Sequence, residues 1–224
     1  MMTVTSSSSV MVPSLLIMLV SSSLMMISPA GSSQPPNDCQ REVIQQSESI
    51  ETQFRLVCNL RTINSKYDQT NFSVIPWQGT VSLAIQCAEL VSHLSRLQQH
   101  SLQHLQQMQD LSISHCKLSS LPANSLAGLD TLVNLSIHTH PDQDHPVSLD
   151  IETGSLSGLY ILRHLDLSYS SIWRLPHNEL CGLQSLTSLN MSHNSVKDVK
   201  DVGFFNDQDS CRWVVESLLK VVAN

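Results

Sequence analysis

The stretch Leu156-x-x-Leu159-x-x-Leu162-x-x-Leu165-x-Leu167 decides the fold, because the same spacing of apolar residues recurs along the second half of the chain. The four copies begin at Leu102, Leu126, Leu156 and Leu180, so that successive copies are offset by 24, 30 and 24 residues. A fixed period in this range is typical of stacked repeats, in which each copy forms one structural unit.

Each copy reads as a coil of a leucine-rich repeat. The apolar residues from Leu162 to Leu167 predict a short strand, and the turn after it carries Cys116, Ser170 or Asn194 at the position where this repeat has Asn or Cys. A single coil leaves its core open on two sides, so stability requires stacking. The sequence therefore predicts an α/β leucine-rich-repeat solenoid, curved, with a parallel sheet on its concave face.

The repeat frame also predicts which strand residues face solvent. They are the pairs Asp110 and Ser112, Asn134 and Ser136, His164 and Asp166, and Ser188 and Asn190. None is aromatic or Arg, the residue types that usually anchor binding energy, so no pair is nominated as a hot spot. The flanks, including the insertion after the second strand and Trp173, are equally plausible contact sites.

The 30-residue copy contains an insertion, His138 to Pro146, with three His and two Asp residues close together. Such a cluster suggests a metal site, but two prolines and no flanking scaffold favour a solvated loop. We expect no bound metal and no cofactor.

Residues 1–30 contain no charged side chain, and an apolar run from Val10 to Ile27 precedes Ser28-Pro29-Ala30. This pattern favours a cleaved signal peptide, although Lys or Arg is absent near its start. The alternative is a membrane anchor. The run is just short of the ~20 residues that span a bilayer, and the triplet Ser21-Ser22-Ser23 interrupts it.

Six cysteines, none in a Cys-x-x-Cys pair, predict disulfides in a secreted chain rather than a zinc site. A Cys39–Cys58 bridge would staple the N-terminal cap, and Cys181 would pair with Cys211; the pairing of Cys87 and Cys116 stays open. Three glycosylation sequons, at Asn71, Asn134 and Asn190, agree with this compartment. Sugars on Asn134 and Asn190 would project from the concave sheet.

The composition argues against two functional classes. A net charge of −7 without a basic patch disfavours nucleic-acid binding. An enzyme is disfavoured because no nucleophile elbow, Gly-rich loop or metal motif positions the many Ser and His residues. An extracellular recognition module remains.

From about Cys39 to Phe204 the chain resembles the long Toll receptors of arthropods, a group that includes 18-wheeler and Tollo. The resemblance rests on these phrases: Leu60-Arg61-Thr62-Ile63-Asn64-Ser65, Cys116-Lys117-Leu118, Leu135-Ser136-Ile137-His138-Thr139-His140, Leu180-Cys181-Gly182-Leu183 and Val202-Gly203-Phe204. It implies an extracellular solenoid, one membrane helix and a cytoplasmic TIR domain. It also implies a role in innate immunity or developmental cell-surface recognition, with an extracellular protein, another surface ligand or another Toll-type ectodomain as partner.

We expect four segments: a signal peptide at 1–30, a cap with a degenerate first repeat at 31–100, the repeats at 101–203 and an atypical tail at 204–224. The expected location is secreted or on the cell surface, with membrane contact only through a missing C-terminal part or an uncleaved signal. A truncated receptor, a soluble decoy and an incomplete gene model stay open. A secreted leucine-rich-repeat adhesion or matrix protein is the alternative function.

The first prediction concerns secretion. The chain expressed in animal cells should appear in the medium with its N-terminus within a few residues of Gly31, because the segment before it has the pattern of a cleaved signal. N-terminal sequencing measures this. An intact Met1 on cell-associated protein would identify the segment as an anchor.

Overall fold

The computed structural model describes residues 38–47, 50–66, 69–88, 93–139, 147–176 and 179–197. All of them belong to one compact unit, Ser33–Asn224. The predicted signal segment 1–30, the tail 204–224, Cys211 and the insertion residues 140–146 lie outside the described residues. Among the described residues, no helix is long and apolar enough to cross a membrane.

The described part of the chain is built from strands and turns. The strands are β1 (Cys39–Ser47), β2 (Ile50–Leu60), β3 (Thr80–Cys87), β4 (Asp110–Ser114), β5 (Ser120–Leu121), β6 (Asn134–His138), β7 (Asp150–Ile151), β8 (His164–Asp166) and β9 (Ser188–Asn190). Its helices are two 3-10 turns, η1 (Phe72–Val74) and η2 (Leu180–Gly182). The predicted α/β class is thus realised with turns, and no α-helix, between the described strands.

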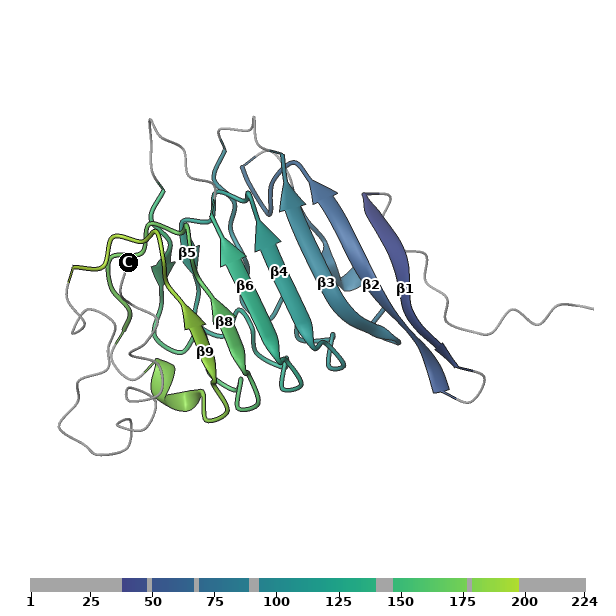
Figure 1. Ribbon diagram of the computed structural model, residues 1–224. Helices are drawn as coiled ribbons and strands as arrows, with labels where there is room; N and C mark the ends of the chain where they lie inside the picture. The colour runs from purple at the N-terminus through teal and green to yellow at the C-terminus, as the bar shows by residue number, and fades with distance from the viewer. Residues whose placement is uncertain are drawn as a thin grey trace, which may run out of the picture. The chain divides into compact units, whose positions relative to one another are not determined.

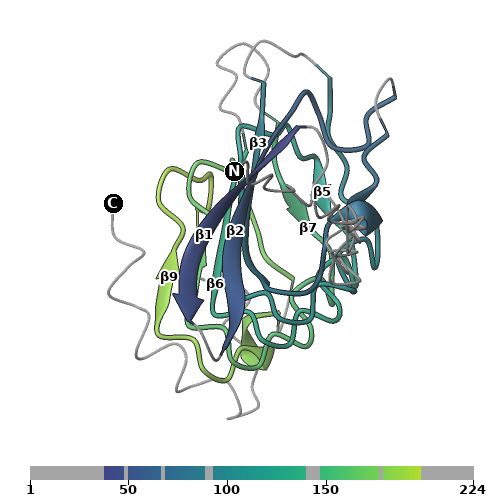
Figure 2. The ribbon, with the colours of Figure 1, turned by 90° about the vertical axis from the view of Figure 1, so that its right-hand side faces the viewer.

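Seven strands form one sheet in the order β1-β2-β3-β4-β6-β8-β9 (Figure 1). β1 and β2 are antiparallel, and every later pair is parallel. The short strands β5 and β7 pair with each other on the opposite side of the coils (Figure 2). The parallel register arises because each coil returns the chain to the same point one strand further along.

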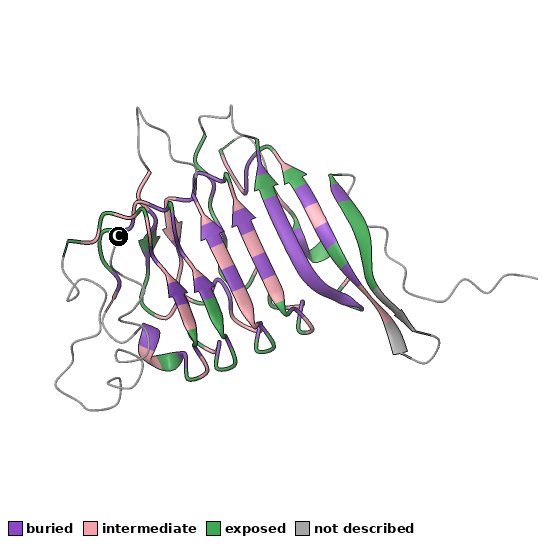
Figure 3. Ribbon diagram, in the orientation of Figure 1, coloured by how far each residue is buried: buried purple, intermediate pink, exposed green. Residues whose placement is uncertain are grey.

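Leucines at one register position line the inside of the large sheet. They are Leu83, Leu111, Leu135, Leu165 and Leu189, which are adjacent from strand to strand. All five are buried, and buried and partly exposed residues alternate along β4 and β6 (Figure 3). Full burial of such a side chain contributes about 1.5–3 kcal/mol. The predicted leucine-rich-repeat solenoid is confirmed.

The leucines that precede each strand close the turns on the other side of the core. In the first copy the Leu105 N–H donates to the Leu102 carbonyl at 2.9 Å, and the Met108 N–H donates to the Leu105 carbonyl at 3.1 Å. The later copies repeat this pattern, ending with the Leu186 N–H on the Leu183 carbonyl at 3.1 Å. Tight turns therefore take the place that helices occupy in other repeat proteins.

Two disulfides fasten the N-terminal end of the sheet. One joins Cys39 to Cys58, directly across the antiparallel β1-β2 pair. The other joins Cys87, at the end of β3, to Cys116 in the turn after β4. Cys116 occupies the Asn/Cys position of its repeat, so a covalent bond holds this turn where other coils use hydrogen bonds. The pairing that the sequence left open is Cys87–Cys116.

A buried carboxylate connects the last two coils within the described residues. Glu179 Oε2 accepts the Gly154 N–H at 2.8 Å, and Glu179 Oε1 accepts the Leu156 N–H at 2.7 Å and the Ser155 hydroxyl at 3.2 Å. One side chain thus satisfies three donors of the preceding coil. Glu152 makes a weaker version of this contact, accepting the Ala123 N–H at 3.1 Å in an exposed setting.

We predict that Glu179→Ala lowers the free energy of unfolding by about 2–4 kcal/mol, because it leaves buried backbone donors unpaired. Glu152→Ala is the matched control, and its effect should stay below about 1 kcal/mol because water can replace the lost bond. Denaturant unfolding of both variants measures the difference. If Glu179→Ala lowers the free energy of unfolding no more than Glu152→Ala does, the assigned role of Glu179 at the coil junction is wrong.

Candidate functional site

The face of the large sheet that points away from the core, here called the open sheet face, displays two rows of polar residues. One row is Asp110, Asn134, His164 and Ser188, and the other is Ser112, Ser136, Asp166 and Asn190. These are the pairs that the repeat frame predicts, and their register is confirmed. Side chains from neighbouring coils therefore meet along each row.

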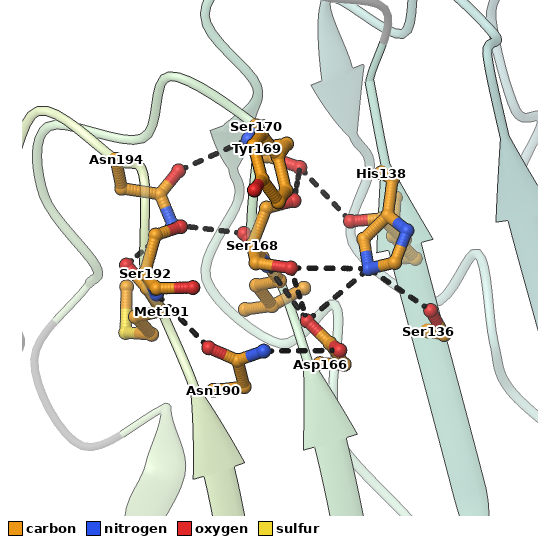
Figure 4. A network of polar contacts seen from close by, with 12 residues as sticks. Ser136, His138, Asp166, Ser168, Tyr169, Ser170, Asn190, Met191, Ser192 and Asn194 are labelled. Atoms are coloured by element: carbon orange, nitrogen blue, oxygen red, sulfur yellow. Dashed lines mark hydrogen bonds and ion pairs between the residues drawn. The ribbon is translucent and has the colours of Figure 1, made fainter. Parts of the chain in front are cut away.

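Asp166 lies at the centre of a polar network at the carboxyl ends of β6, β8 and β9 (Figure 4). Its Oδ1 accepts the Ser168 N–H at 2.9 Å and the Ser168 hydroxyl at 2.7 Å, and it lies 3.2 Å from His138 Nε2. Its Oδ2 accepts the Asn190 amide at 3.2 Å. Asp166 therefore bonds to the coil before it and to the coil after it.

These contacts set the charge of Asp166. Burial alone would raise the pKa of its carboxyl, but hydrogen bonds from the Ser168 side chain and backbone, together with His138, lower the pKa from its ordinary value of 3.8. Asp166 is therefore a carboxylate at neutral pH, and it lies within hydrogen-bonding distance of His138 Nε2.

The Ser, His and Asp residues of this network do not form a catalytic triad. In a triad the carboxylate binds one ring nitrogen of His and the nucleophile binds the other. Here Ser136, Ser168 and Asp166 all contact the same nitrogen, His138 Nε2, each at 3.2 Å. No serine can pass its proton through this ring to the carboxylate, so the arrangement suits hydrogen-bonded recognition.

Aromatic and imidazole rings stand beside the network. The Tyr169 ring stacks on the His193 ring of the next coil, with centroids 4.2 Å apart and an interplanar angle of 14°. The His138 ring meets Tyr169 edge-on at 6.5 Å. We call His138, Asp166, Ser168, Tyr169 and His193 the rim patch. Tyr169 is 47% exposed, so the patch offers an aromatic surface to solvent.

The backbone under the rings is strained. Tyr169 has a φ of 54° and His193 a φ of 56°, in the left-handed region that costs a non-glycine residue about 1–2 kcal/mol. Hydrogen bonds hold these turns in place. Asn194 Oδ1 accepts the Ser170 N–H at 3.1 Å and the Ile172 N–H at 3.0 Å, while the Asn194 amide donates to the Leu167 carbonyl at 2.8 Å.

The predicted glycosylation sites lie in two settings. Asn71 is exposed at the start of η1, where its Oδ1 accepts the Ser73 N–H at 3.0 Å and the Ser73 hydroxyl at 2.6 Å. Asn134 and Asn190 lie on the open sheet face, where their amides donate to Asp110 and Asp166. Sugar attachment at all three stays a prediction.

The predicted disulfide residues fall at both ends of the repeats. Cys39 and Cys58 form the cap disulfide. Cys181 belongs to η2 and is disulfide-bonded. Cys211 lies outside the described residues, so the Cys181–Cys211 pairing stays a prediction.

Trp173, named from the sequence as a flank residue, is 51% exposed, and the Arg174 guanidinium lies 4.4 Å from its ring centroid. Tyr169 was missed by sequence reasoning. It occupies the turn position directly before the Asn/Cys position, where the repeat pattern prescribes no residue type. The repetition of a ring residue there, at Tyr169 and again at His193, is the signal that could have identified it.

The comparisons with known proteins agree with this geometry. The leucine-rich-repeat family model matches residues 149–196. Toll-like receptor 7 of Drosophila melanogaster is 32% identical over 178 residues, covering 79% of this chain and 12% of that receptor. The chain is a leucine-rich-repeat protein similar to Toll-like receptors.

Two mammalian relatives extend the likeness. Toll-like receptor 4 of Sus scrofa is 32% identical over 136 residues, which is 53% of this chain and 16% of that receptor. Fibromodulin of Oryctolagus cuniculus is 35% identical over 99 residues, which is 43% of this chain and 59% of fibromodulin. The chain thus spans only a small part of the Toll-like receptors that it matches.

We predict that Asp166→Asn destabilises the fold at pH 7 and that the difference from wild type shrinks in acid. A lowered pKa in the folded state means that ionised Asp166 stabilises the fold above pH 3.8, and that this stabilisation is lost as pH falls through the folded pKa. Denaturant unfolding at a series of pH values measures it, with the exposed Asp130→Asn as control. A difference that does not change with pH would contradict the assignment.

Proposed function

We propose that this chain is the ligand-recognition part of the extracellular region of a Toll-type receptor, and that the rim patch makes its central contact. The rim patch is the observation on which the proposal rests. Tyr is among the residues enriched at binding hot spots, and strained backbone is concentrated at functional sites. Here an exposed Tyr ring is held on strained backbone by neighbours from two adjoining coils.

The extent of the likeness supports a Toll-type receptor over a matrix protein. The match to the Drosophila receptor covers 178 residues, whereas the predicted repeat segment 101–203 is much shorter. The likeness therefore extends beyond the repeats into the cap or the tail. The alignment with fibromodulin covers only 99 residues, a length that the repeat segment alone can account for. Repeats alone are common to many extracellular proteins.

In this proposal the receptor belongs to the long Toll group of arthropods and acts in innate immunity or developmental cell-surface recognition. Its ligand is an extracellular protein or another surface ligand, including another Toll-type ectodomain. The membrane helix and the TIR domain of such a receptor would follow the recognition part. The contact itself combines the Tyr169 ring edge and hydroxyl with the imidazoles of His138 and His193.

A binding screen tests the proposal. The full chain, secreted and assembled into pentamers for avidity, is applied to an array of purified secreted and cell-surface ectodomains that includes the chain itself. We expect reproducible binding, and we expect Tyr169→Ala to raise the Kd at least about 30-fold, the equivalent of about 2 kcal/mol for a hot-spot residue.

Tyr160→Ala is the matched control, because Tyr160 is also exposed (56%) but precedes β8, whereas Tyr169 follows it. Thermal unfolding verifies that both variants stay folded. Absence of any binding, or equal binding by the two Tyr variants, would overturn the assignment of the rim patch.

A further inference from the structure

A groove of about 450 Å³ crosses the N-terminal half of the open sheet face, between β1 and β6. Its floor is made of small residues at adjacent register positions: Ser82 and Ala84 on β3, Ser112 on β4 and Ser136 on β6. Ala84 is only 3% exposed although its side of the strand faces away from the core. The neighbouring side chains therefore rise well above this floor.

An irregular edge strand forms one wall of the groove. Val43 pairs with Phe54 and Gln45 with Gln53, so Ile44 is an extra residue in a β-bulge. Bulges of this kind redirect side chains. Val43 and Ile44 both line the groove, and they are 57% and 55% exposed. The wall is thus an apolar surface that no described part of the chain covers.

Asn134 and Asp110 stand at the opposite side. Both line the groove, and the Asn134 amide donates to Asp110 Oδ1. Asn134 is also the first residue of the sequon Asn134-Leu135-Ser136, whose Ser136 is part of the floor. The side-chain amide that would carry the sugar therefore belongs to a residue that lines the groove, and the opposite wall of the groove is apolar.

We propose that an N-linked glycan on Asn134 occupies this groove and covers the N-terminal half of the open sheet face. Attachment forms a bond between Asn134 Nδ2 and the anomeric carbon of the sugar. It breaks the sugar–phosphate bond of a lipid-linked pyrophosphate oligosaccharide, and it releases the lipid pyrophosphate and one amide proton. The second amide proton remains and still donates to Asp110, which fixes the direction in which the sugar leaves the strand.

The chemistry of the groove suits a carbohydrate. A sugar ring is amphipathic, with C–H faces that pack on the side chains of Val43 and Ile44 and hydroxyls that bond to polar groups such as Ser112 and Arg55, both of which line the groove. A tethered occupant also has a high effective concentration and displaces free ligands of ordinary affinity. The glycan on Asn134 thus keeps ligands away from the N-terminal half of the open sheet face.

Asn190 provides an internal comparison. Its amide donates to Asp166 in the preceding coil, just as the Asn134 amide donates to Asp110 in the coil before it. Asn190, however, does not line the groove. A sugar there has no contact with Val43 and Ile44. The two sequons therefore separate the effect of filling the groove from the effect of adding a glycan.

Hydroxyl-radical footprinting of the secreted full chain tests the proposal, with oxidation of Val43 and Ile44 read by mass spectrometry. Ser136→Ala removes the Asn134 sequon and keeps the Asn134–Asp110 hydrogen bond. Ser192→Ala removes the Asn190 sequon in the same way. We expect Val43 and Ile44 to be oxidised several-fold faster in Ser136→Ala than in wild type, and unchanged in Ser192→Ala.

Asn134→Gln is the second variant and should reproduce the Ser136→Ala result, which separates loss of the sugar from loss of the Ser136 contact with His138. Wild-type protein that carries no sugar on Asn134, or oxidation rates that do not depend on that sugar, would overturn the inference. The inference rests on the proposed extracellular function, but its test uses no ligand. A failed binding screen together with a protected groove would reject only the role of the rim patch.

Discussion

The repeat region of this protein depends on the parallel stacking of coils, because one coil cannot bury its leucines alone. Leu135 is covered only because Leu111 and Leu165 lie at the same register in the coils on either side. This constraint fixes the spacing between coils at the distance between paired strands. It also aligns the polar side chains on the opposite face, so the two polar rows of the open sheet face are a consequence of how the core is packed.

The turn after each strand forms the hydrogen bonds of the coil junction, and it also determines where the exposed ring lies. It must satisfy the polar groups of the coil junction, which Ser170 and Asn194 do with side-chain hydrogen bonds. It must also place the preceding residue in the left-handed region, which raises the ring of Tyr169 or His193 toward solvent. Removing a junction bond therefore weakens the stack and releases the ring. The atoms that stabilise the coil junction are therefore the same ones that position the rim patch.

The sequence predicts what repeats and misses what occurs once. The strands, their register and the solvent-facing rows follow from leucine spacing, because the same side chain must meet the same neighbour in every coil. Three features escape this reasoning. The Cys87–Cys116 bond depends on how the cap meets the first coil, and the bulge at Ile44 depends on a local irregularity of an edge strand. The contact between the Tyr169 and His138 rings depends on which side chains occupy neighbouring coils. Each is set by tertiary contacts that leucine spacing does not encode.

The contacts of Asp166 join recognition to the alignment of the coils. Its carboxylate accepts a bond from Asn190 in the following coil and faces His138 in the preceding one. Three coils must therefore keep their register for the rim patch to exist. A ligand that binds His138 and Tyr169 together stabilises that register, because it binds only the stacked arrangement. By the same linkage, a change that loosens the stacking weakens the ligand contact, even when it lies in the core far from the open sheet face.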